Sequence, residues 1–308
     1  MGDDWISFLE GEKMAEKKEN KFLRNSRDEE GGYFGLGRMI DFSDGVTRIA
    51  LMLTALSAIA GTLFKVMQGD SSDNATYFGL NVAMQFFFVW LLAQELDPDR
   101  KLGGIIGGGI SIVMAITLGI GNVLTLLWLV FILRLISQTS GCRHRIGDNA
   151  ILIIVSYFLG KDGLWLYPTL TGVAYVMESQ LKGGYFRSLY IGGLAFAVTA
   201  TANITNEPVV ISSIYLYLMA VTFILFLPAI SMAAVTKFKG EKNGVRINPR
   251  RLQAAQGLFL VFNFLLAWFH GDQVALDMAP AWAAAMGVGA YLLSMAVQKA
   301  IFDKKEKE

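Results

Sequence analysis

Long blocks of hydrophobic residues follow one another along this chain, separated by short polar gaps. Ten blocks can be read, at 46–67, 77–94, 103–119, 122–138, 149–160, 164–181, 187–203, 208–235, 254–270 and 279–301. An α-helix needs about 20 apolar residues to cross the hydrocarbon core of a bilayer. Because lipid offers no hydrogen-bond partners, such segments must satisfy their backbone groups internally, as helices do. The pattern predicts an all-α fold, a polytopic integral membrane bundle of about ten transmembrane helices.

Basic residues fall almost entirely into alternate gaps between these blocks. The gaps after the even-numbered blocks and the end of the chain hold most of them, whereas the other gaps hold only Lys161. Lys and Arg concentrate on the cytoplasmic side of membrane helices. We therefore expect both termini in the cytoplasm and an even number of crossings. The predicted location is the cell (plasma or inner) membrane, with the lipid bilayer as the surroundings of the bundle.

Two pairs of blocks leave an alternative open, because they are short. Residues 103–138 and residues 149–181 each fit two full spans, or a re-entrant hairpin that dips into the membrane and returns to the same side. Both options leave the two termini on the same side of the membrane. Eight spans plus a re-entrant hairpin is therefore the alternative to ten spans. In the re-entrant case Lys161 and Asp162 would lie deep and form a buried pair.

Composition agrees with a membrane class and excludes several others. The chain has 308 residues, 54% of them hydrophobic, and its mean hydropathy is +0.45. Charged residues make up 17%, below the roughly 25% of soluble domains. The basic residues sit at block edges rather than on one face, so we expect no nucleic-acid partner. One cysteine, Cys142, and two histidines predict no disulfide, no metal site and no cofactor.

Three regions follow from the distribution of charge. Residues 1–45 form a charged cytoplasmic extension with 7 basic and 11 acidic residues, and they are the candidate surface for a protein partner. Residues 46–302 form the transmembrane domain. Residues 303–308 form a basic cytoplasmic tail.

The polar stretch before the first block contains two recognisable spacings. Asp41, Asp44 and Gly45, followed by Arg48, resemble the first half of the CDP-alcohol phosphotransferase signature. That resemblance implies a divalent metal held between carboxylates and transfer of a phosphoryl-linked alcohol. The chain departs from the family because no acidic residue occurs in 46–69, so a four-carboxylate metal site cannot be built.

The same stretch resembles a second family over about nine residues. Residues 42–46, with Arg38 ahead of them, are similar to the first-helix motif of the endolysosomal and bacterial potassium-channel family, although the later helices do not follow its pattern. We favour a simpler interpretation, in which Ser43 or Asp44 caps the first helix.

Two loops on the predicted cytoplasmic side carry both acids and bases. The residues are Glu95, Asp97, Asp99 and Arg100 in one loop, and Arg143, Arg145 and Asp148 in the next. If the loops face each other, they form one polar cluster that could bind a cation or a phosphate-bearing group. The simpler interpretation is a charged turn after a helix broken by proline.

Inside the blocks, polar residues are few. The amides Asn81, Gln85 and Asn263 are the candidates to line a substrate path. Arg134 stands about one turn from the end of its block, and we expect it to extend its charge to the cytoplasmic interface. Glycines at 103, 104, 107, 108 and 109 give overlapping Gly-x-x-x-Gly spacings, which predict a face where helices pack closely.

These features favour a small-solute transporter or permease of unknown substrate, whose ligand would be a small molecule. The span count, short loops and absence of a soluble catalytic region carry that expectation, which is an argument from fold class. One alternative is a membrane-embedded enzyme that acts on a lipid or isoprenoid head group at the cytoplasmic face. Another is a membrane assembly partner without chemistry of its own.

Overall fold

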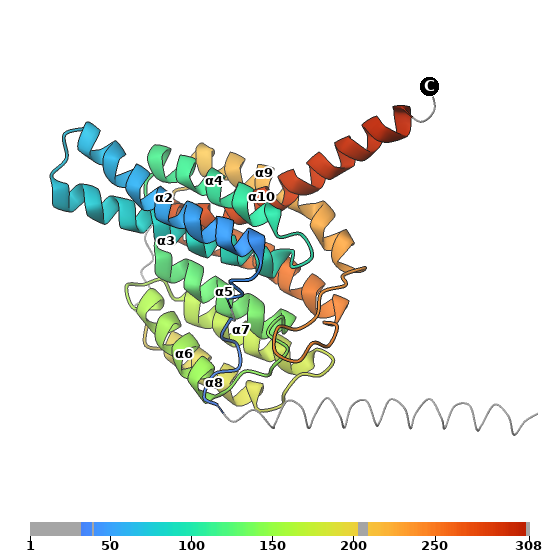
Figure 1. Ribbon diagram of the computed structural model, residues 1–308. Helices are drawn as coiled ribbons and strands as arrows, with labels where there is room; N and C mark the ends of the chain where they lie inside the picture. The colour runs from blue at the N-terminus through green and yellow to red at the C-terminus, as the bar shows by residue number, and fades with distance from the viewer. Residues whose placement is uncertain (1–31, 39, 203–208, 306–308) are drawn as a thin grey trace, which may run out of the picture.

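The structure is a computed structural model that describes residues 32–38, 40–202 and 209–305 (Figure 1). Helices take up 74% of the described residues, and no strand is found among them. The all-α prediction is therefore confirmed. Most of the extension predicted over 1–45, and half of the tail predicted over 303–308, lie outside the described residues.

Nine helices make up the described part of the chain, and they follow the predicted hydrophobic blocks. They are α2 (Gly45–Met67), α3 (Ser72–Leu96), α4 (Leu102–Thr117), α5 (Val123–Ser137), α6 (Ile146–Gly160), α7 (Leu166–Gln180), α8 (Ser188–Thr199), α9 (Ser213–Ala233) and α10 (Pro249–Lys305). In the described residues, α2, α3, α9 and α10 are each long and apolar enough to cross a membrane. The helices between α3 and α9 are shorter.

α10 contains the last two hydrophobic blocks in one element. A loop was expected over 271–278, but these residues are helical apart from Gly271, whose φ of 71° and ψ of −155° interrupt the helix. A positive φ is readily adopted only by glycine. A Cβ at this position would also come within 2.6 Å of the Val210 carbonyl oxygen. A single glycine therefore takes the place of the expected loop.

The first helix begins as the sequence suggested. Asp44 is the N-cap of α2, where its Oδ2 accepts hydrogen bonds from the Thr47 N–H (3.1 Å) and the Thr47 hydroxyl (2.8 Å). Lys101 Nζ lies 3.2 Å from the same carboxylate. Of the two candidates, Asp44 rather than Ser43 is the cap, since Ser43 is bonded to Asp41.

The glycines of α4 let that helix approach two neighbours. A Cβ on Gly107 would lie 2.9 Å from the Ala283 carbonyl oxygen of α10, and a Cβ on Gly108 would lie 2.4 Å from the Phe86 ring of α3. The two helices approach even more closely at Gly287 of α10, where an added Cβ would lie 2.2 Å from the Gly107 nitrogen. The predicted packing face is confirmed, and it serves α3 and α10 together.

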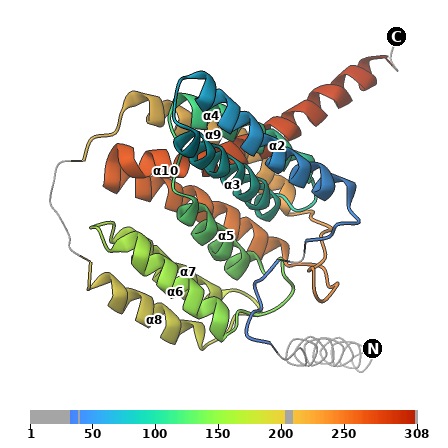
Figure 2. The ribbon, with the colours of Figure 1, turned by 60° about the vertical axis from the view of Figure 1, so that its left-hand side comes forward.

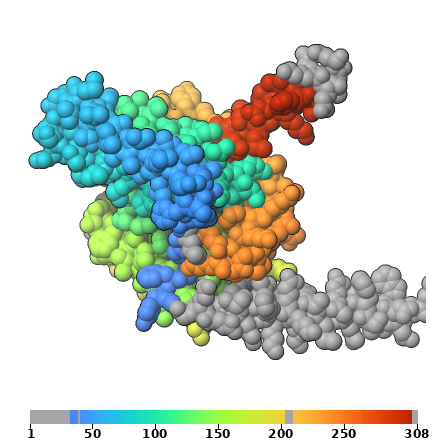
Figure 3. Space-filling model, viewed as in Figure 1, coloured from blue at the N-terminus to red at the C-terminus, as the bar shows by residue number. Residues whose placement is uncertain are grey.

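Figures 1 and 2 show how the helices are arranged. α3, α4, α5 and α10 meet at the centre, where Trp90, Trp128 and Trp282 are fully buried. α6, α7 and α8 form a layer at one edge of the bundle, with α7 and α8 in close contact. The α2–α3 hairpin and the C-terminal end of α10 extend beyond the rest (Figure 3).

The outer surface of the long helices is apolar. α2 exposes Met52 and Leu56, and α9 exposes Ile224 and Leu227, among many other large hydrophobic side chains. Soluble monomers rarely expose apolar patches of more than a few hundred Å². Apolar helices of this length, with this outer surface, are those of a membrane protein.

Candidate functional site at the basic end of the bundle

Five polar segments meet at one end of the bundle, which we call the basic end. They are residues 32–38, 95–101, 138–148, 182–188 and 236–251. The Glu241 N–H donates to the Thr139 carbonyl oxygen (3.1 Å), and Arg251 Nε donates to the Lys182 carbonyl oxygen (2.9 Å). The loops that carry most of the basic residues thus lie together.

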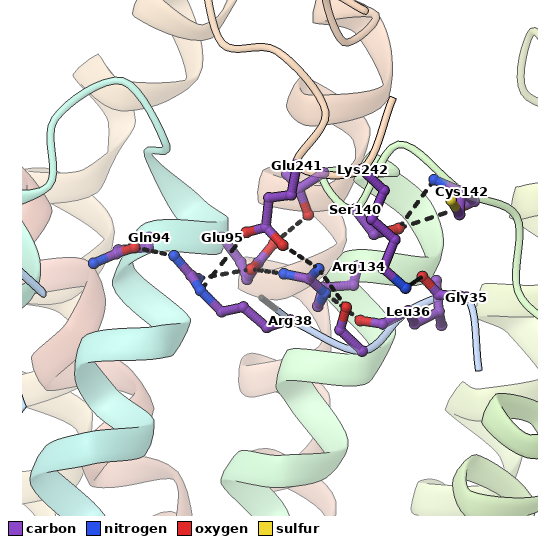
Figure 4. Close-up of polar contacts among 12 residues, drawn as sticks. Gly35, Leu36, Arg38, Gln94, Glu95, Arg134, Ser140, Cys142, Glu241 and Lys242 are labelled. Carbon is purple, nitrogen blue, oxygen red and sulfur yellow. Dashed lines mark hydrogen bonds and ion pairs between the residues drawn. The ribbon is translucent and has the colours of Figure 1, made fainter. Parts of the chain in front are cut away.

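Arg134 of α5 is the centre of a buried charge network at this end (Figure 4). Its Nη1 donates to Glu95 Oε1 (2.5 Å), and its Nη2 donates to Glu241 Oε2 (2.8 Å). Its Nε donates to the Leu36 carbonyl oxygen (2.5 Å). The guanidinium therefore joins α5 to α3, to the loop before α10 and to the segment before α2.

Arg38 completes the network from the segment before α2. Its Nη1 lies 3.0 Å from Glu95 Oε1 and its Nε lies 3.6 Å from Glu241 Oε1. Arg38 also donates to the side chain of Gln94, and the Thr139 hydroxyl donates to Glu95 Oε2. Each carboxylate thus contacts both guanidinium groups, and the two positive and two negative charges balance.

The guanidinium of Arg134 reaches the segments of the basic end, but it is buried there. Its side chain is 2% exposed and that of Glu95 is 1% exposed. Extension into solvent would take Glu95 away from its main partner, and an unpaired buried charge costs several kcal/mol. The sequence does not indicate this pairing, because the two glutamates lie 39 and 107 positions away from Arg134.

A cavity of about 390 Å³ opens beside the network. Its polar lining residues include Arg38, Asp41, Gln94, Glu95, Lys101, Thr139, Lys239 and Glu241. Trp90, Ile40 and Phe238 supply apolar walls. Charges of both signs therefore face the same small space, and three of the four network residues line it.

A second buried carboxylate, Glu178 of α7, holds the neighbouring part of the basic end. Its Oε1 lies 3.3 Å from Arg251 Nη2, and its Oε2 accepts from the Ser188 hydroxyl (2.5 Å) and the Tyr185 N–H (3.1 Å). Arg251 also donates to the Ile136 carbonyl oxygen (2.9 Å). Glu178 was not among the residues expected from the sequence, although an acid near the end of an apolar block is a signal that could have marked it.

The residues of the first loop of the predicted cytoplasmic cluster have different partners. Glu95 belongs to the network of Arg134, whereas Asp97 pairs with Arg100 Nη1 at 2.7 Å. Burial raises the pKa of the Asp97 carboxyl, and Arg100 acts in the opposite direction. Asp99 accepts from the Lys237 N–H (3.2 Å).

The second loop lies elsewhere, against residues 32–36. Asp148 is buried and accepts from the N–H groups of Gly35 (2.6 Å), Leu36 (3.1 Å) and Arg145 (2.8 Å). Arg143 lies over the Tyr185 ring, 5.3 Å from its centroid. The seven candidates therefore occupy the basic end, but the cavity beside the network is lined by residues of the first loop and by none of the second.

Of the three amides proposed for a substrate path, Gln85 and Asn263 are buried among helices, whereas Asn81 is partly exposed. Gln85 is 1% exposed, donates to the Ser111 carbonyl oxygen (3.0 Å) and accepts from the Gly121 N–H (3.3 Å). Asn263 donates to the carbonyl oxygen four residues before it (2.7 Å), and Asn81 does the same (2.9 Å). None of them is among the residues that line the cavity beside the charge network.

Lys161 and Asp162 lie in the turn between α6 and α7, and both are exposed. Lys161 Nζ lies 5.9 Å from the Phe158 ring centroid, and no ion pair among the described residues joins it to Asp162. The neighbouring Trp165 packs on His270, beside the Gly271 break of α10. This turn is therefore at the end of the bundle opposite the basic end.

No group of three or more His, Cys, Asp or Glu side chains in the described residues could hold a metal ion. The polar chemistry at the basic end is that of paired arginines and glutamates. Comparisons of the chain with protein-family models, with curated proteins and with solved structures found no match.

Proposed function

We propose that this protein is a multi-pass membrane protein with ten helical segments and both termini on the cytoplasmic side. The two halves of α10 on either side of Gly271 support the count of ten, together with the eight helices before them. The meeting of the basic loops at one end supports the orientation, since Lys and Arg concentrate on the cytoplasmic side. α4 to α8 are short for a bilayer, and local thinning accommodates short spans at modest cost.

We further propose that it transports a small polar solute, and that the charge network of Arg38, Glu95, Arg134 and Glu241 closes the path on the cytoplasmic side. The network carries this proposal. Ionisable groups buried in a membrane protein are costly, and they commonly mark a functional site. Here four of them converge from four separate parts of the chain.

The connections of the network suit a gate. Arg38 and Glu241 come from segments without regular secondary structure, whereas Glu95 and Arg134 come from helices. Movement of the two segments would separate Glu241 from Arg134 without unfolding a helix. Rearrangement of a few loop residues is a common way to open and close a site.

The cavity beside the network favours one class of solute. Its walls carry Arg38, Lys101 and Lys239 as well as Asp41 and Glu241. A zwitterion presents both signs of charge and would find partners on both sides. A singly charged ion would meet repulsion from one set of walls.

The test begins with purified protein and a thermal-shift screen of amino acids, betaines and polyols. Solutes that raise the melting temperature are then measured for uptake into proteoliposomes. We expect saturable uptake of at least one zwitterion. In the Glu95→Gln variant the rate of uptake should change by roughly tenfold or more, because the network loses one of its two negative charges. Lys65→Gln, which removes an exposed pair with Asp70 at the opposite end, should leave uptake unchanged.

Uptake equal to that of empty liposomes for every solute tested would overturn the transport proposal. Equal uptake by wild-type protein and a folded Glu95→Gln variant would overturn the role of the network.

A further inference from the structure

A groove separate from the charge network lies between α6 and α8 at the edge of the bundle. Its volume is about 1170 Å³, and Figure 2 shows the two helices side by side there. Residues 32–33 border it at the basic end. Neither the transport proposal nor any residue of the network depends on this groove.

The end of the groove that faces the loops is strongly basic. Arg143, Arg145 and Arg187 line it together with His144, and its lining residues include no Asp or Glu. Arg143 and Arg187 both lie over the Tyr185 ring, 5.3 and 5.6 Å from its centroid. One aromatic side chain thus holds two guanidinium groups near each other.

Two helix N-termini add to this charge. α6 begins at Ile146 and α8 begins at Ser188, directly after the arginines. The N-terminus of a helix carries a partial positive charge and favours anions. The nearest acids, Asp148 and Glu178, are fully buried and already accept several hydrogen bonds each. The basic end of the groove is therefore complementary to an anion.

One buried nitrogen atom in the lining lacks a hydrogen-bond partner. Arg143 Nε is buried and unpartnered among the described residues. His144 beside it is 6% exposed, with its Nε2 bonded to the Ser188 hydroxyl (2.8 Å) and its ring also hydrogen-bonded to Asn149. Buried polar atoms are nearly always bonded, so Arg143 Nε points to a ligand group that would satisfy it.

The rest of the groove is apolar. Ile146, Ile153 and Ile154 line it from α6, and Ile191 and Leu194 line it from α8. The α6 residues recur at helical spacing on one face and extend over roughly 12 Å, from the rise of 1.5 Å per residue. Ile146, Ile154 and Leu194 are each more than half exposed. An apolar part of the groove, which we call the apolar channel, thus leads away from the basic end.

We propose that this groove binds an anionic glycerophospholipid. The phosphate group lies against Arg143, His144 and Arg187, and one acyl chain lies between α6 and α8. Basic pockets between membrane helices on the cytoplasmic side are suited to anionic lipid head groups. The order of charged and apolar surface, from the loops toward the middle of the helices, matches the order of head group and chain in a lipid.

The experiment uses the full-length protein in detergent and native mass spectrometry. Phosphatidylglycerol is the anionic probe, phosphatidylcholine is the zwitterionic lipid, and inorganic phosphate is the probe without a chain. We expect phosphatidylglycerol to bind at least tenfold more tightly than phosphatidylcholine. The Arg143→Gln, Arg187→Gln variant should lose roughly 10- to 30-fold in affinity for phosphatidylglycerol, at about one kcal/mol for each basic residue.

Two controls keep the result specific. Arg250→Gln removes an exposed charge from the basic end outside the groove and should bind as the wild type does. Leu194→Trp should fill the apolar channel and weaken lipid binding while leaving the arginines in place. Each variant is compared only if its size-exclusion profile and helix content match the wild type.

Several results would overturn the proposal. Equal affinity for the two lipids would exclude recognition of the negative charge, and unchanged affinity in the double-arginine variant would exclude the groove. Inorganic phosphate that displaces the lipid at equal concentration would show an anion site without an acyl-chain channel. Failure of solute uptake would leave this binding unaffected, so the two proposals can fail separately.

Discussion

Replacement of Arg134 by leucine is expected to destabilise the protein far more than loss of an exposed ion pair. The variant removes the central guanidinium and leaves Glu95 almost fully buried, with Arg38 at 3.0 Å as its remaining cationic partner. The Leu36 carbonyl oxygen loses its 2.5 Å donor at the same time. Both losses raise the free energy of the folded state.

The expected size follows from these contacts. Breaking a buried ion pair costs about 3–5 kcal/mol. Because Arg38 remains beside Glu95, we expect the lower end of that range, about 3 kcal/mol. At about 2–4 °C per kcal/mol for a chain of this size class, the melting temperature should fall by roughly 6–12 °C. Lys65→Gln breaks a pair whose side chains are 28% and 40% exposed, and it should cost less than about 1 kcal/mol.

The assay is thermal unfolding in detergent micelles, followed by tryptophan fluorescence at one fixed heating rate. A double variant, Glu95→Leu with Arg134→Leu, tests the reasoning further. It removes both buried charges, and Arg38 and Glu241 remain to pair with each other at 3.6 Å. Its loss should therefore be smaller than the sum of the two single losses by more than about 1 kcal/mol. Simple additivity, or a melting temperature for Arg134→Leu within 2–4 °C of that of the Lys65→Gln control, would refute a strongly coupled network.

Three further outcomes are expected. Gly287→Ala places a Cβ 2.2 Å from a backbone nitrogen of α4, and this overpacking should lower the free energy of unfolding by about 1–3 kcal/mol, seen as a lower melting temperature. Gly109→Ala meets nothing within 4 Å and should be neutral or slightly stabilising. Glu178→Gln should be destabilising by about 3 kcal/mol, because it breaks the buried ion pair between Glu178 and Arg251; a thermal melt checks this. Burial lowers the pKa of His144 in the folded protein, and Arg143 lowers it further. Glu178, the hydrogen bond to Asn149 and Asp148 act in the opposite direction without outweighing burial. The unfolded chain then binds the proton more readily, so stability should fall as the pH drops below about 6.5, and the fall should be smaller in His144→Gln.

The features that were correctly predicted from the sequence are those that depend on local order. Hydrophobic blocks become helices because each helix makes its own backbone hydrogen bonds. Asp44 caps α2 by accepting from the N–H three positions further along the chain. The glycine spacing of α4 required only helical periodicity to indicate a packing face. The helix break at Gly271 was missed as such, because an isolated glycine does not by itself distinguish a sharp bend from a loop.

The polar site could be predicted only in outline. Residues such as Glu95 and Asp148 stood out as acids at the predicted interface, but their partners are distant in sequence. Glu95 meets Arg134 across 39 positions, and Asp148 binds Gly35 across 113. The charge pattern of the loops indicates the side of the membrane on which an acidic residue lies. It does not indicate which of several arginines that acidic residue contacts. The burial of Arg134 and its two glutamate partners could not be predicted for this reason.

Segment 32–38 links the two parts of the basic end through its backbone. The carbonyl oxygen of Leu36 accepts from Arg134 of the charge network, and the N–H of the same residue donates to Asp148, at the start of α6. The carbonyl oxygen of Gly32 accepts from Arg145, which lines the groove. Because backbone groups make these contacts, exchange of the side chains in this segment would not remove them. These contacts require a chain that can pass close to the loop before α6. Gly35 meets that requirement, since a Cβ there would lie 1.9 Å from the Arg143 carbonyl oxygen. Gly35, which the sequence placed in the charged extension of residues 1–45, is therefore part of the fold.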